Sequence, residues 1–508
     1  MNHLSKIYQK LEDIRIQKNE VVQLQHFEKA AHLRDQEKQL LEEADRIEAE
    51  YRLNLSKSKY VQGMNCLKSL WLNVYRHDEQ QISANQTQKF ESGTDIGMLA
   101  RELFPNGVLA VPSGHNPNAA SADYTRELIE QGVTTIYEAT FIYDRIVVAI
   151  DILDFKNGQW HAFEVKASNS IKPIYHTDAA IQFYVLKHMP FQTPIDINII
   201  HFNSHYVRKG DLNLEQLFFI QNLTTEAQNL QTDILSNTRK LKLTLLGLEP
   251  VIEMGKQCKN PYPCPFTHYC MQQIPKKEES GDEGQIDEPV VDIPAIRQFV
   301  AESKYGVGFL DFESIMPAIP MFDESRPYQQ IVFQYSLHKQ EYHDSEIEHL
   351  EHLADAHHDP RIQIIPSLIE HTRELQTIFV YNIVFEQSRI REMMRDFPEY
   401  ADELRQLDLK LKDLMPVFRY HYRTKSMGGQ YGIKTVLPIV CPDLSYSELE
   451  INQGQAASDA FLALYEEKDP TIIHTTRQHL IKYCTLDTYA MVRLWEVLKG
   501  LVNKKSKS

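Results

Sequence analysis

Two hydrophobic runs, each ending in acidic residues, lie within EATFIYDRIVVAIDILDFKNGQWHAFEVK, residues 138–166. The first run, IVVAID, ends at Asp151, and the second, WHAFEVK, carries Glu164 and Lys166. Lys-Asn-Gly at 156–158 separates the runs and favours a tight turn between two strands. Side chains two residues apart on a strand share a face, so we expect Glu164 and Lys166 to point the same way. The hairpin should bring Asp151 beside them.

Two carboxylates and an ammonium on one sheet edge suit metal-assisted cleavage of a phosphodiester. The carboxylates would hold a divalent ion such as Mg²⁺ or Mn²⁺, and the lysine would activate water or neutralise developing charge. An ordinary half-buried hairpin with exposed charges is the alternative. The order of residues resembles the PD-(D/E)XK nuclease superfamily, with Asp151 as its D and Glu164-Val165-Lys166 as its E-x-K. The resemblance implies a restriction-endonuclease-like α/β core, with Glu138 as a candidate further metal ligand.

Length and charge limit the classes of protein. The chain has 508 residues and a formal net charge of −16. This length predicts roughly two to four domains with large buried cores. The acidic balance argues against a surface coated in basic residues, although local basic grooves suffice for a nuclease. No apolar run approaches a membrane span and the polar N-terminus lacks a signal-peptide pattern, so we expect a cytoplasmic protein without a membrane partner.

Residues 1–50 contain neither glycine nor proline, and their apolar residues recur at helical spacing. The pattern predicts a helical hairpin or coiled coil used for contact. Within it, QHFEKAAHLRDQEKQL at 25–40 resembles the UVR motif, a short helical hairpin of the UvrB and UvrC repair proteins. The matching core is 27–31 followed by 33–35. The resemblance implies docking to a protein partner, with a generic helical hairpin as the alternative.

Three cysteines, Cys258, Cys264 and Cys270, lie in a proline-rich loop with five residues between neighbours. Cys66 is the candidate fourth ligand, although alone it would be a packed core thiol. One distant N-terminal cysteine and three at the end of a nuclease fold resemble the iron–sulfur RecB-like nucleases. The resemblance implies a [4Fe–4S] cluster that fastens the two ends of the domain together. Zinc is the alternative, with His268 as a further candidate ligand, but the spacing lacks the C-x₂-C knuckles usual for zinc.

A helix is predicted at 171–189, after the E-x-K segment, and an apolar strand at 194–207. Gln182 on this helix is a candidate substrate-binding residue, or else a structural hydrogen-bonder. Many RecB-like nucleases carry Gln-x-x-x-Tyr here. This chain departs from the motif, because Leu186 stands four residues after Gln182 and Tyr184 is the nearest tyrosine.

Three further segments complete this part of the chain. Residues 90–110 predict a helix ended by a Pro-Asn-Gly turn, and residues 211–250 predict polar helix. Residues 276–292 are rich in acidic residues with glycine and proline, which predicts a flexible linker. Cys441 and Cys484 fall outside the cysteine cluster and are predicted to be packed thiols.

A second set of acidic residues lies on three predicted elements of the C-terminal region. These are a strand at 305–315, a strand-to-helix junction at 378–393 and a helix at 478–498. In chain order the residues are Asp311, Glu313, Glu386 and Asp487, with Tyr483 one helical turn before Asp487. Residues two apart on a strand and four apart on a helix share a face, so each pair is expected to point in one direction.

This order, D-x-E, then N-x-x-F-E, then Y-x-x-x-D, resembles the DEDDy 3′–5′ exonucleases of the RNase H-like superfamily. The resemblance implies four acids around two metal ions, with Tyr483 orienting the attacking water. Glu386 departs from the family pattern, which usually has Asp there. The region also resembles a bacterial domain of unknown function that often follows a RecB-like nuclease. Lys434 is a candidate phosphate contact, or else a solvated lysine.

We therefore expect an α/β multidomain protein. It would comprise a helical hairpin with the UVR-like motif (1–54), a RecB-like nuclease with the four-cysteine cluster (55–275), the acidic linker (276–292) and an RNase H-like exonuclease domain (293–508). The expected function is metal-dependent hydrolysis of DNA at two centres, in repair, recombination or phage defence. The alternatives are a nucleic-acid-binding scaffold with one or both centres inactive, and an RNA-processing exonuclease.

Overall fold

The structure, a computed structural model, describes residues 3–51, 53–82, 84–111, 116–191, 195–274, 288–342 and 345–504. The chain divides into two units. The N-terminal unit comprises Met1–Tyr206 and Asp211–Lys277, and the C-terminal unit comprises Val207–Gly210 and Glu278–Ser508. Residues 276–287 of the predicted linker lie outside the described residues.

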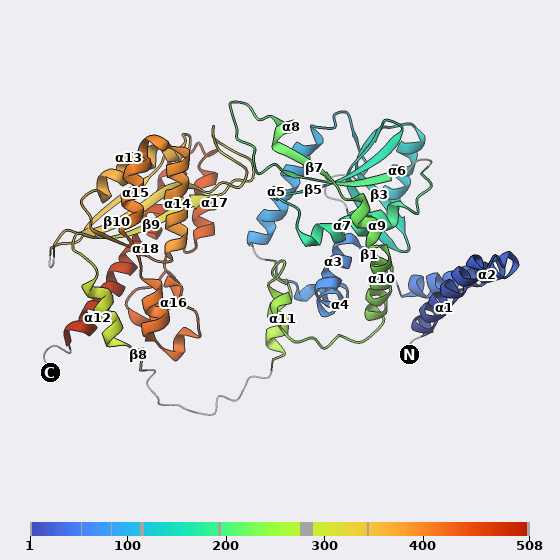
Figure 1. Cartoon of the computed structure of the whole chain (residues 1–508), viewed down its shortest axis with the longest axis horizontal. Helices are drawn as coiled ribbons and strands as arrows, with labels where there is room; N and C mark the ends of the chain where they lie inside the picture. Colours follow the sequence, from blue (N-terminus) through green and yellow to red (C-terminus); the bar gives the residue numbers. More distant parts are fainter. Residues whose placement is uncertain are drawn as a thin grey trace. The chain divides into compact units, whose positions relative to one another are not determined.

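A mixed sheet forms the centre of the N-terminal unit (Figure 1). Its strands run in the order β2-β3-β4-β5-β6-β7, and β1 pairs with β4. Their bounds are β1 (Leu55–Ser56), β2 (Val108–Leu109), β3 (Thr135–Tyr143), β4 (Ile146–Lys156), β5 (Gln159–Lys166), β6 (Ile195–Phe202) and β7 (Phe218–Asn222). Strands β3, β4 and β5 are antiparallel neighbours, whereas β5 and β6 are parallel and are connected through α7.

The helices of this unit are α1 (His3–Gln23), α2 (Phe27–Glu50), α3 (Lys57–Asn65), α4 (Leu67–Tyr75), α5 (Ala84–Arg101), α6 (Ala119–Glu130), α7 (Pro173–Leu186), α8 (Leu214–Leu217), α9 (Thr224–Asn229), α10 (Gln231–Leu245) and α11 (Thr267–Gln272). Helices α3, α5, α6, α7, α8 and α9 contact the sheet, and the remaining helices of the unit lie farther from it. Helix α7 contacts β3, β4 and β6, and α5 contacts β5. The segment predicted to be polar helix at 211–250 differs from the prediction, because β7 adds a strand to the sheet edge there.

The turn between β4 and β5 agrees with the sequence pattern. Asn157 and Gly158 both have left-handed backbone angles, with φ of 55° and 77°. Two such residues form the type I′ turn whose twist matches a hairpin, and Asn-Gly is a favoured pair for it. The turn fixes the register of β4 and β5, with Ile152 opposite Phe163. This register brings Asp151 of β4 beside Glu164 of β5.

Helices α1 and α2 form the helical hairpin predicted for residues 1–50 (Figure 1). A buried polar network ties this hairpin to the rest of the unit. Lys242 of α10, 1% exposed, donates to Glu48 Oε2 of α2 (2.5 Å) and to Asp144 Oδ1 (2.7 Å). Tyr8 of α1 donates to the other oxygen of Glu48 (2.5 Å). The buried carboxylate of Glu48 is therefore fully hydrogen-bonded and charge-compensated.

The C-terminal unit contains a five-stranded sheet in the order β11-β10-β9-β12-β13. The strands of this unit, with β8 and β14 outside that sheet, are β8 (Val290–Val291), β9 (Val307–Ile315), β10 (Ile331–Gln340), β11 (Glu348–Leu353), β12 (Thr377–Val380), β13 (Leu411–Asp413) and β14 (Tyr422–Arg423). Helices are α12 (Ile293–Ala301), α13 (Pro360–Thr372), α14 (Ile383–Asp396), α15 (Ala401–Lys410), α16 (Ile433–Val440), α17 (Gly454–Ala463) and α18 (Pro470–Lys504). Strand β9 is antiparallel to β10 and parallel to β12, so it lies at the centre of the sheet.

Alternation along β9 assigns its side chains to two faces. Leu310 and Phe312 pack in a core with α13, α14 and α15. Phe309 and Ile315 pack in a second core with α12, α16, α17 and α18. Because the side-chain period of a strand is two, Asp311 belongs to this second face. Among the described residues, no helix is both long and apolar enough to cross a membrane.

The buried network at Glu48 generates a stability prediction. Lys242→Ala removes the ammonium and leaves a buried, uncompensated carboxylate, so it should lower the free energy of unfolding of the N-terminal unit by about 3–5 kcal/mol. Urea denaturation measures this change. The control is Glu12→Ala, which removes the exposed partner of Arg239 and so breaks a contact between α1 and α10. That exposed pair should contribute less than about 1 kcal/mol. Equal losses in the two variants would contradict the anchoring role of Glu48.

Candidate active sites

Strands β4 and β5 bring together the three residues singled out first in the sequence. The Asp151 Oδ2 atom accepts a hydrogen bond from the Val165 backbone N–H (2.7 Å). The Lys166 ammonium donates to Glu164 Oε1 (2.8 Å). Glu164 is 4% exposed, so this cluster is buried rather than displayed on an ordinary solvated hairpin. We refer to Asp151, Glu164 and Lys166 as the first centre.

Two charged residues that the sequence analysis missed complete the first centre. Lys57, at the start of α3, donates to Glu164 Oε1 (2.5 Å). Asp178 of α7 accepts a hydrogen bond from Lys166. The pairing of β1 with β4 delivers Lys57 to the sheet, and Ser56 caps the helix that Lys57 begins. For Asp178 a signal was present, since it lies one helical turn before Gln182.

Gln182 is fully buried and donates to Glu164 Oε2, so it orients this carboxylate. This contact fits the alternative that Gln182 is a structural hydrogen-bonder, and its role in substrate binding stays a prediction. Tyr184 lies away from the first centre, because its hydroxyl donates to Asp144 (3.1 Å). Tyr175, missed by the sequence analysis, lies beside Lys166 instead, with the Nζ 5.2 Å from the ring centroid.

Glu138 reaches the vicinity of the first centre from β3. Its φ of 54° is left-handed, and the unbroken register of β3 with β4 sets it opposite Asp151. The Arg101 guanidinium donates to Glu138 Oε1 (2.6 Å), and burial, together with the charge of Glu164, raises the pKa of Glu138.

Electrostatics divide the carboxylates of the first centre into two kinds. Burial and the charge of Glu164 raise the pKa of Asp151 to about 7, although Lys57 opposes the rise. Burial also acts against the charge of Glu164, but Lys166 and Lys57 outweigh it and lower the pKa of Glu164 to about 2. Glu164 is therefore ionised at neutral pH, and the ammonium groups of Lys166 and Lys57 balance its negative charge. In the part of the chain that the structure describes, Asp151 forms no ion pair, so a cation bound there would balance its charge.

The four cysteines of the proposed cluster line one pocket. Cys66 precedes α4, and Cys258, Cys264 and Cys270 come from the loop and helix α11. Burial raises the pKa of the Cys66 thiol, and Cys264 and Cys258 are close enough to add to this effect. No three of these sulfurs all lie within 4.8 Å of one another. In the described part of the chain, one other group of possible metal ligands does meet that limit. Tetrahedral zinc, with Zn–S bonds of about 2.3 Å, requires sulfurs about 3.8 Å apart.

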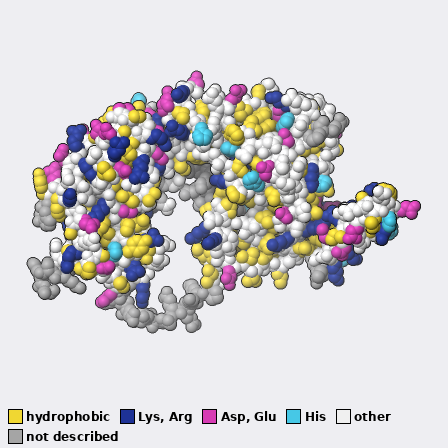
Figure 2. Space-filling model, in the orientation of Figure 1, with side chains coloured by type: hydrophobic (Ala, Val, Ile, Leu, Met, Phe, Trp, Pro, Cys, Tyr) yellow, Lys and Arg dark blue, Asp and Glu magenta, His cyan; other side chains and the backbone are white. Residues whose placement is uncertain are grey.

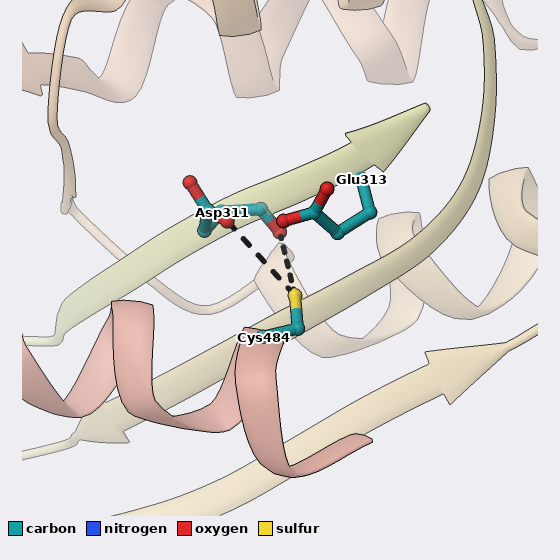
Figure 3. A group of neighbouring side chains, drawn as sticks. All are labelled: Asp311, Glu313 and Cys484. Carbon is teal, nitrogen blue, oxygen red and sulfur yellow. Dashed lines mark hydrogen bonds between the residues drawn. The ribbon is translucent and has the colours of Figure 1, made fainter. Parts of the chain in front are cut away.

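The C-terminal unit contains a second centre, formed by Asp311 and Glu313 on β9 and by α18. One oxygen of each acid and the Cys484 sulfur all lie within 4.8 Å of one another (Figure 3). Cys484 is fully buried, as predicted for a packed thiol, and its sulfur also lies beside these two carboxylates. Its position three residues before Asp487 places both side chains on the α18 face that covers β9.

Aromatic hydroxyls surround Asp487. Tyr446 donates to Asp487 Oδ1 (2.7 Å). The Tyr483 oxygen accepts a hydrogen bond from Lys434 (2.8 Å), and Lys434 also donates to the Asn452 carbonyl (2.7 Å). Lys434 is exposed, yet it is directed at the tyrosine rather than only into solvent. Tyr446 gave no signal in the sequence, because it lies in a loop between α16 and α17.

Glu386 stands in the first turn of α14 and is 2% exposed. Its Oε2 atom has no hydrogen-bond partner among the described residues. Asp413, at the end of β13, accepts hydrogen bonds from the backbone N–H groups of Asn382 and Ile383 (3.1 Å each) and so fixes the start of this helix. The charge of Glu386 raises the pKa of Asp311 and of Glu313, so its longer side chain lies near these two acids of β9.

The second centre differs from the first in its charge balance. Burial, then the charge of Asp487, raises the pKa of both Asp311 and Glu313 well above the ordinary values. Burial raises the pKa of Glu386 to about 8 and that of Asp487 to about 6. Within the described ranges, none of these four acids forms an ion pair with lysine or arginine. Three buried carboxylates and the half-buried Asp311, without an ion pair among the described residues, fit a site for divalent cations.

Known proteins resemble parts of this chain. Residues 308–432 match a domain of unknown function, DUF2779, and residues 9–43 match the UvrB/uvrC motif. The second match confirms the UVR-like hairpin. The first agrees with the predicted bacterial domain and includes Asp311, Glu313 and Glu386.

Two relatives are uncharacterized protein MG366, from Mycoplasma genitalium, and uncharacterized protein MG366 homolog, from Mycoplasma pneumoniae. They are 27% identical over 218 residues and 26% identical over 217 residues. The match covers 39% of this chain and 32% of each relative, so the chain spans about a third of their length. No solved structure matches the chain.

The pKa values of the second centre predict a pH-dependent response to metal. The folded pKa values of about 6 and about 8 exceed those of the unfolded chain, about 4. The folded unit therefore binds more protons, and its stability should fall as the pH rises from about 4 to about 8. Mn²⁺ should offset this loss, so it should raise the melting temperature more at about pH 8 than at about pH 5. Thermal unfolding with and without Mn²⁺ measures the difference.

Asp311→Asn provides the control for this experiment. It keeps the shape of the side chain and removes one ligand, so most of the gain from Mn²⁺ at the higher pH should disappear. An equal gain at both pH values in the wild type would contradict the assignment of these acids as a cation site.

Proposed function

We propose that the protein is a metal-dependent nuclease with two separate centres that hydrolyse phosphodiester bonds in DNA. One observation carries the proposal: in each unit, acidic residues from separate segments converge on a buried face of a central strand. Their order along the chain resembles the PD-(D/E)XK and DEDDy nucleases. Buried carboxylates cost stability unless they are paired or bind cations, so their convergence favours a functional role over a structural one.

At the first centre, Asp151 and Glu164 would hold a divalent ion, with Glu138 beside them. That ion would lower the pKa of a bound water and stabilise charge on the phosphate. Lys166, held by Glu164 and Asp178, would present its ammonium to the phosphate as negative charge develops. Gln182 would keep the carboxylate of Glu164 in place.

At the second centre, Asp311, Glu313, Glu386 and Asp487 would hold the ions of a DEDDy-type site. Tyr483 would orient the attacking water. The hydrogen bond from Lys434 occupies a lone pair of the tyrosine oxygen and so directs the hydroxyl proton away from the lysine. Glu386 reaches this region despite replacing the usual Asp, and its unpartnered oxygen supports a role as ligand.

For the cysteines we propose a [4Fe–4S] cluster, with zinc as the alternative. The spacing of the cysteines along the chain supports this choice, since it lacks the C-x₂-C knuckles usual for structural zinc. The cluster would join Cys66 to the segment that carries Cys258, Cys264 and Cys270, and so tie the start of the nuclease unit to its end.

Charge on the surface bears on the choice of substrate and partner. Lys and Arg side chains gather over α13–α15, interspersed with Asp and Glu (Figure 2). Several are paired, such as Arg391 with Asp408. Recognition of nucleic acid would therefore depend on the two centres and their ions more than on a broad basic surface. The UVR-like hairpin would dock a protein partner.

Cleavage assays with matched variants test the proposal. Labelled single-stranded DNA, double-stranded DNA and RNA are incubated with Mg²⁺ or Mn²⁺. Asp151→Asn should lower cleavage at the first centre by about 100-fold or more, and Asp311→Asn should do the same at the second centre. The double variant should lose both activities. Preferred cleavage of RNA would favour the RNA-processing alternative.

The control is Asp154→Asn, on the same strand as Asp151 but bonded to Thr135. It should cleave as the wild type does. Absence of cleavage in the wild type with every substrate would leave the nucleic-acid-binding scaffold as the better account.

Metal analysis tests the cysteine site separately. Protein purified without oxygen should contain about four irons per chain with acid-labile sulfide. Cys66→Ser should lose them, whereas Cys441→Ser, at a buried thiol outside the pocket, should keep them. Zinc without iron in the wild type would contradict the cluster.

A further inference from the structure

Cys484 introduces a sulfur into a centre otherwise made of carboxylates. It lies on α18 with its sulfur 3.9 Å from Asp311 Oδ2 and 4.0 Å from the Asp311 carbonyl oxygen. Figure 3 shows the thiol and the carboxylates of Asp311 and Glu313 pointing toward one another. This group is the one set of acid and thiol side chains in the described residues whose ligand atoms all lie within 4.8 Å.

Glu313 supplies an independent sign of a ligand. Its side chain is 7% exposed, and its carboxylate accepts no hydrogen bond from the part of the chain that the structure describes. A buried carboxylate without a hydrogen-bond donor is costly to keep, and the charge of Lys434 offsets only part of that cost. Figure 3 shows Asp311 and Cys484 beside the carboxylate of Glu313, so the three side chains offer three ligand atoms to one ion.

The geometry distinguishes soft ions from hard ions. Zinc binds thiolate at about 2.3 Å and carboxylate at about 2.0 Å, so a tetrahedral site places sulfur and oxygen about 3.5 Å apart. The 3.9 Å between Cys484 and Asp311 is within a few tenths of that separation. Magnesium takes oxygen ligands and would not use the sulfur.

We infer that Asp311, Glu313 and Cys484 form a mixed carboxylate–thiolate site for a thiophilic divalent ion of the Zn²⁺ class. On binding, the S–H bond of Cys484 breaks, a metal–sulfur bond forms and the proton passes to solvent. Because the same two carboxylates would hold Mg²⁺ or Mn²⁺, the thiophilic ion inhibits cleavage at this centre. The binding site stands independently, whereas the inhibition rests on the proposed nuclease function.

Cobalt replaces zinc and reports its ligands by absorption. Co²⁺ is added to the full chain after the four-cysteine pocket has been loaded with its iron–sulfur cluster or zinc. The added ion then reports on other sites. The wild type should develop the near-ultraviolet band of a cysteine–cobalt bond. Cys484→Ser should lose the band, and Cys441→Ser, which removes the other buried thiol of this unit, should retain it. An unchanged band in Cys484→Ser, or none in the wild type, overturns the site.

Two further measurements keep the result interpretable. Circular dichroism verifies that each variant is folded, and Glu313→Gln, which leaves the thiol intact, should also weaken cobalt binding. Loss of an outer-shell partner already costs about 10–100-fold in metal affinity, so loss of a ligand should cost at least as much. Undiminished binding in Glu313→Gln overturns the assignment.

The final arm measures Mg²⁺-dependent cleavage in Asp151→Asn, which retains the second centre alone. Zn²⁺ should inhibit it, and adding Cys484→Ser should raise the inhibitory concentration by about tenfold or more. A cobalt band without cleavage in any variant supports the thiolate site and refutes the nuclease function. Cleavage with no cobalt band refutes the thiolate site and leaves the nuclease function standing.

Discussion

Buried carboxylates need positive charge beside them, and the two units meet this need differently. At the first centre the chain itself supplies it: Lys57 and Lys166 contact Glu164, and Arg101 contacts Glu138. At the second centre, four carboxylates gather around β9 and α18 with no ion pair among the described residues. Their raised pKa values express the unmet need for a cation. The need for a bound cation is therefore greatest at the second centre, and at the first centre it rests on Asp151, whose pKa burial raises.

Local signals in the sequence predicted the parts of the fold that local physics controls. Asn-Gly between alternating apolar runs gave the β4–β5 hairpin, and the period of two placed Glu164 and Lys166 on one face. Residues 1–50 gave the helical hairpin because nothing in them interrupts a helix. On β9 the same alternation placed Asp311 on the face that α18 covers.

Contacts between distant segments were beyond these signals. Lys57 reaches Glu164 only because β1 pairs with β4, and no pattern at Lys57 announces that pairing. Strand β7 was missed because its pattern within a polar region is set by pairing with β6 rather than by its own residues. Cys484 resembled a core thiol in sequence, and only the packing of α18 against β9 turns it toward Asp311. The sequence thus named acids that converge, but not the groups that balance their charge.

The central claim is that the chain holds two independent cation sites built on Asp151 and Asp311. Titration of Mn²⁺ followed by electron paramagnetic resonance tests it directly, because the signal of free Mn²⁺ disappears on binding. The wild type should show two classes of site, Asp151→Asn should lose one class, and Asp311→Asn should lose the other. A single class in the wild type, or a variant that removes both classes or neither, would contradict the account.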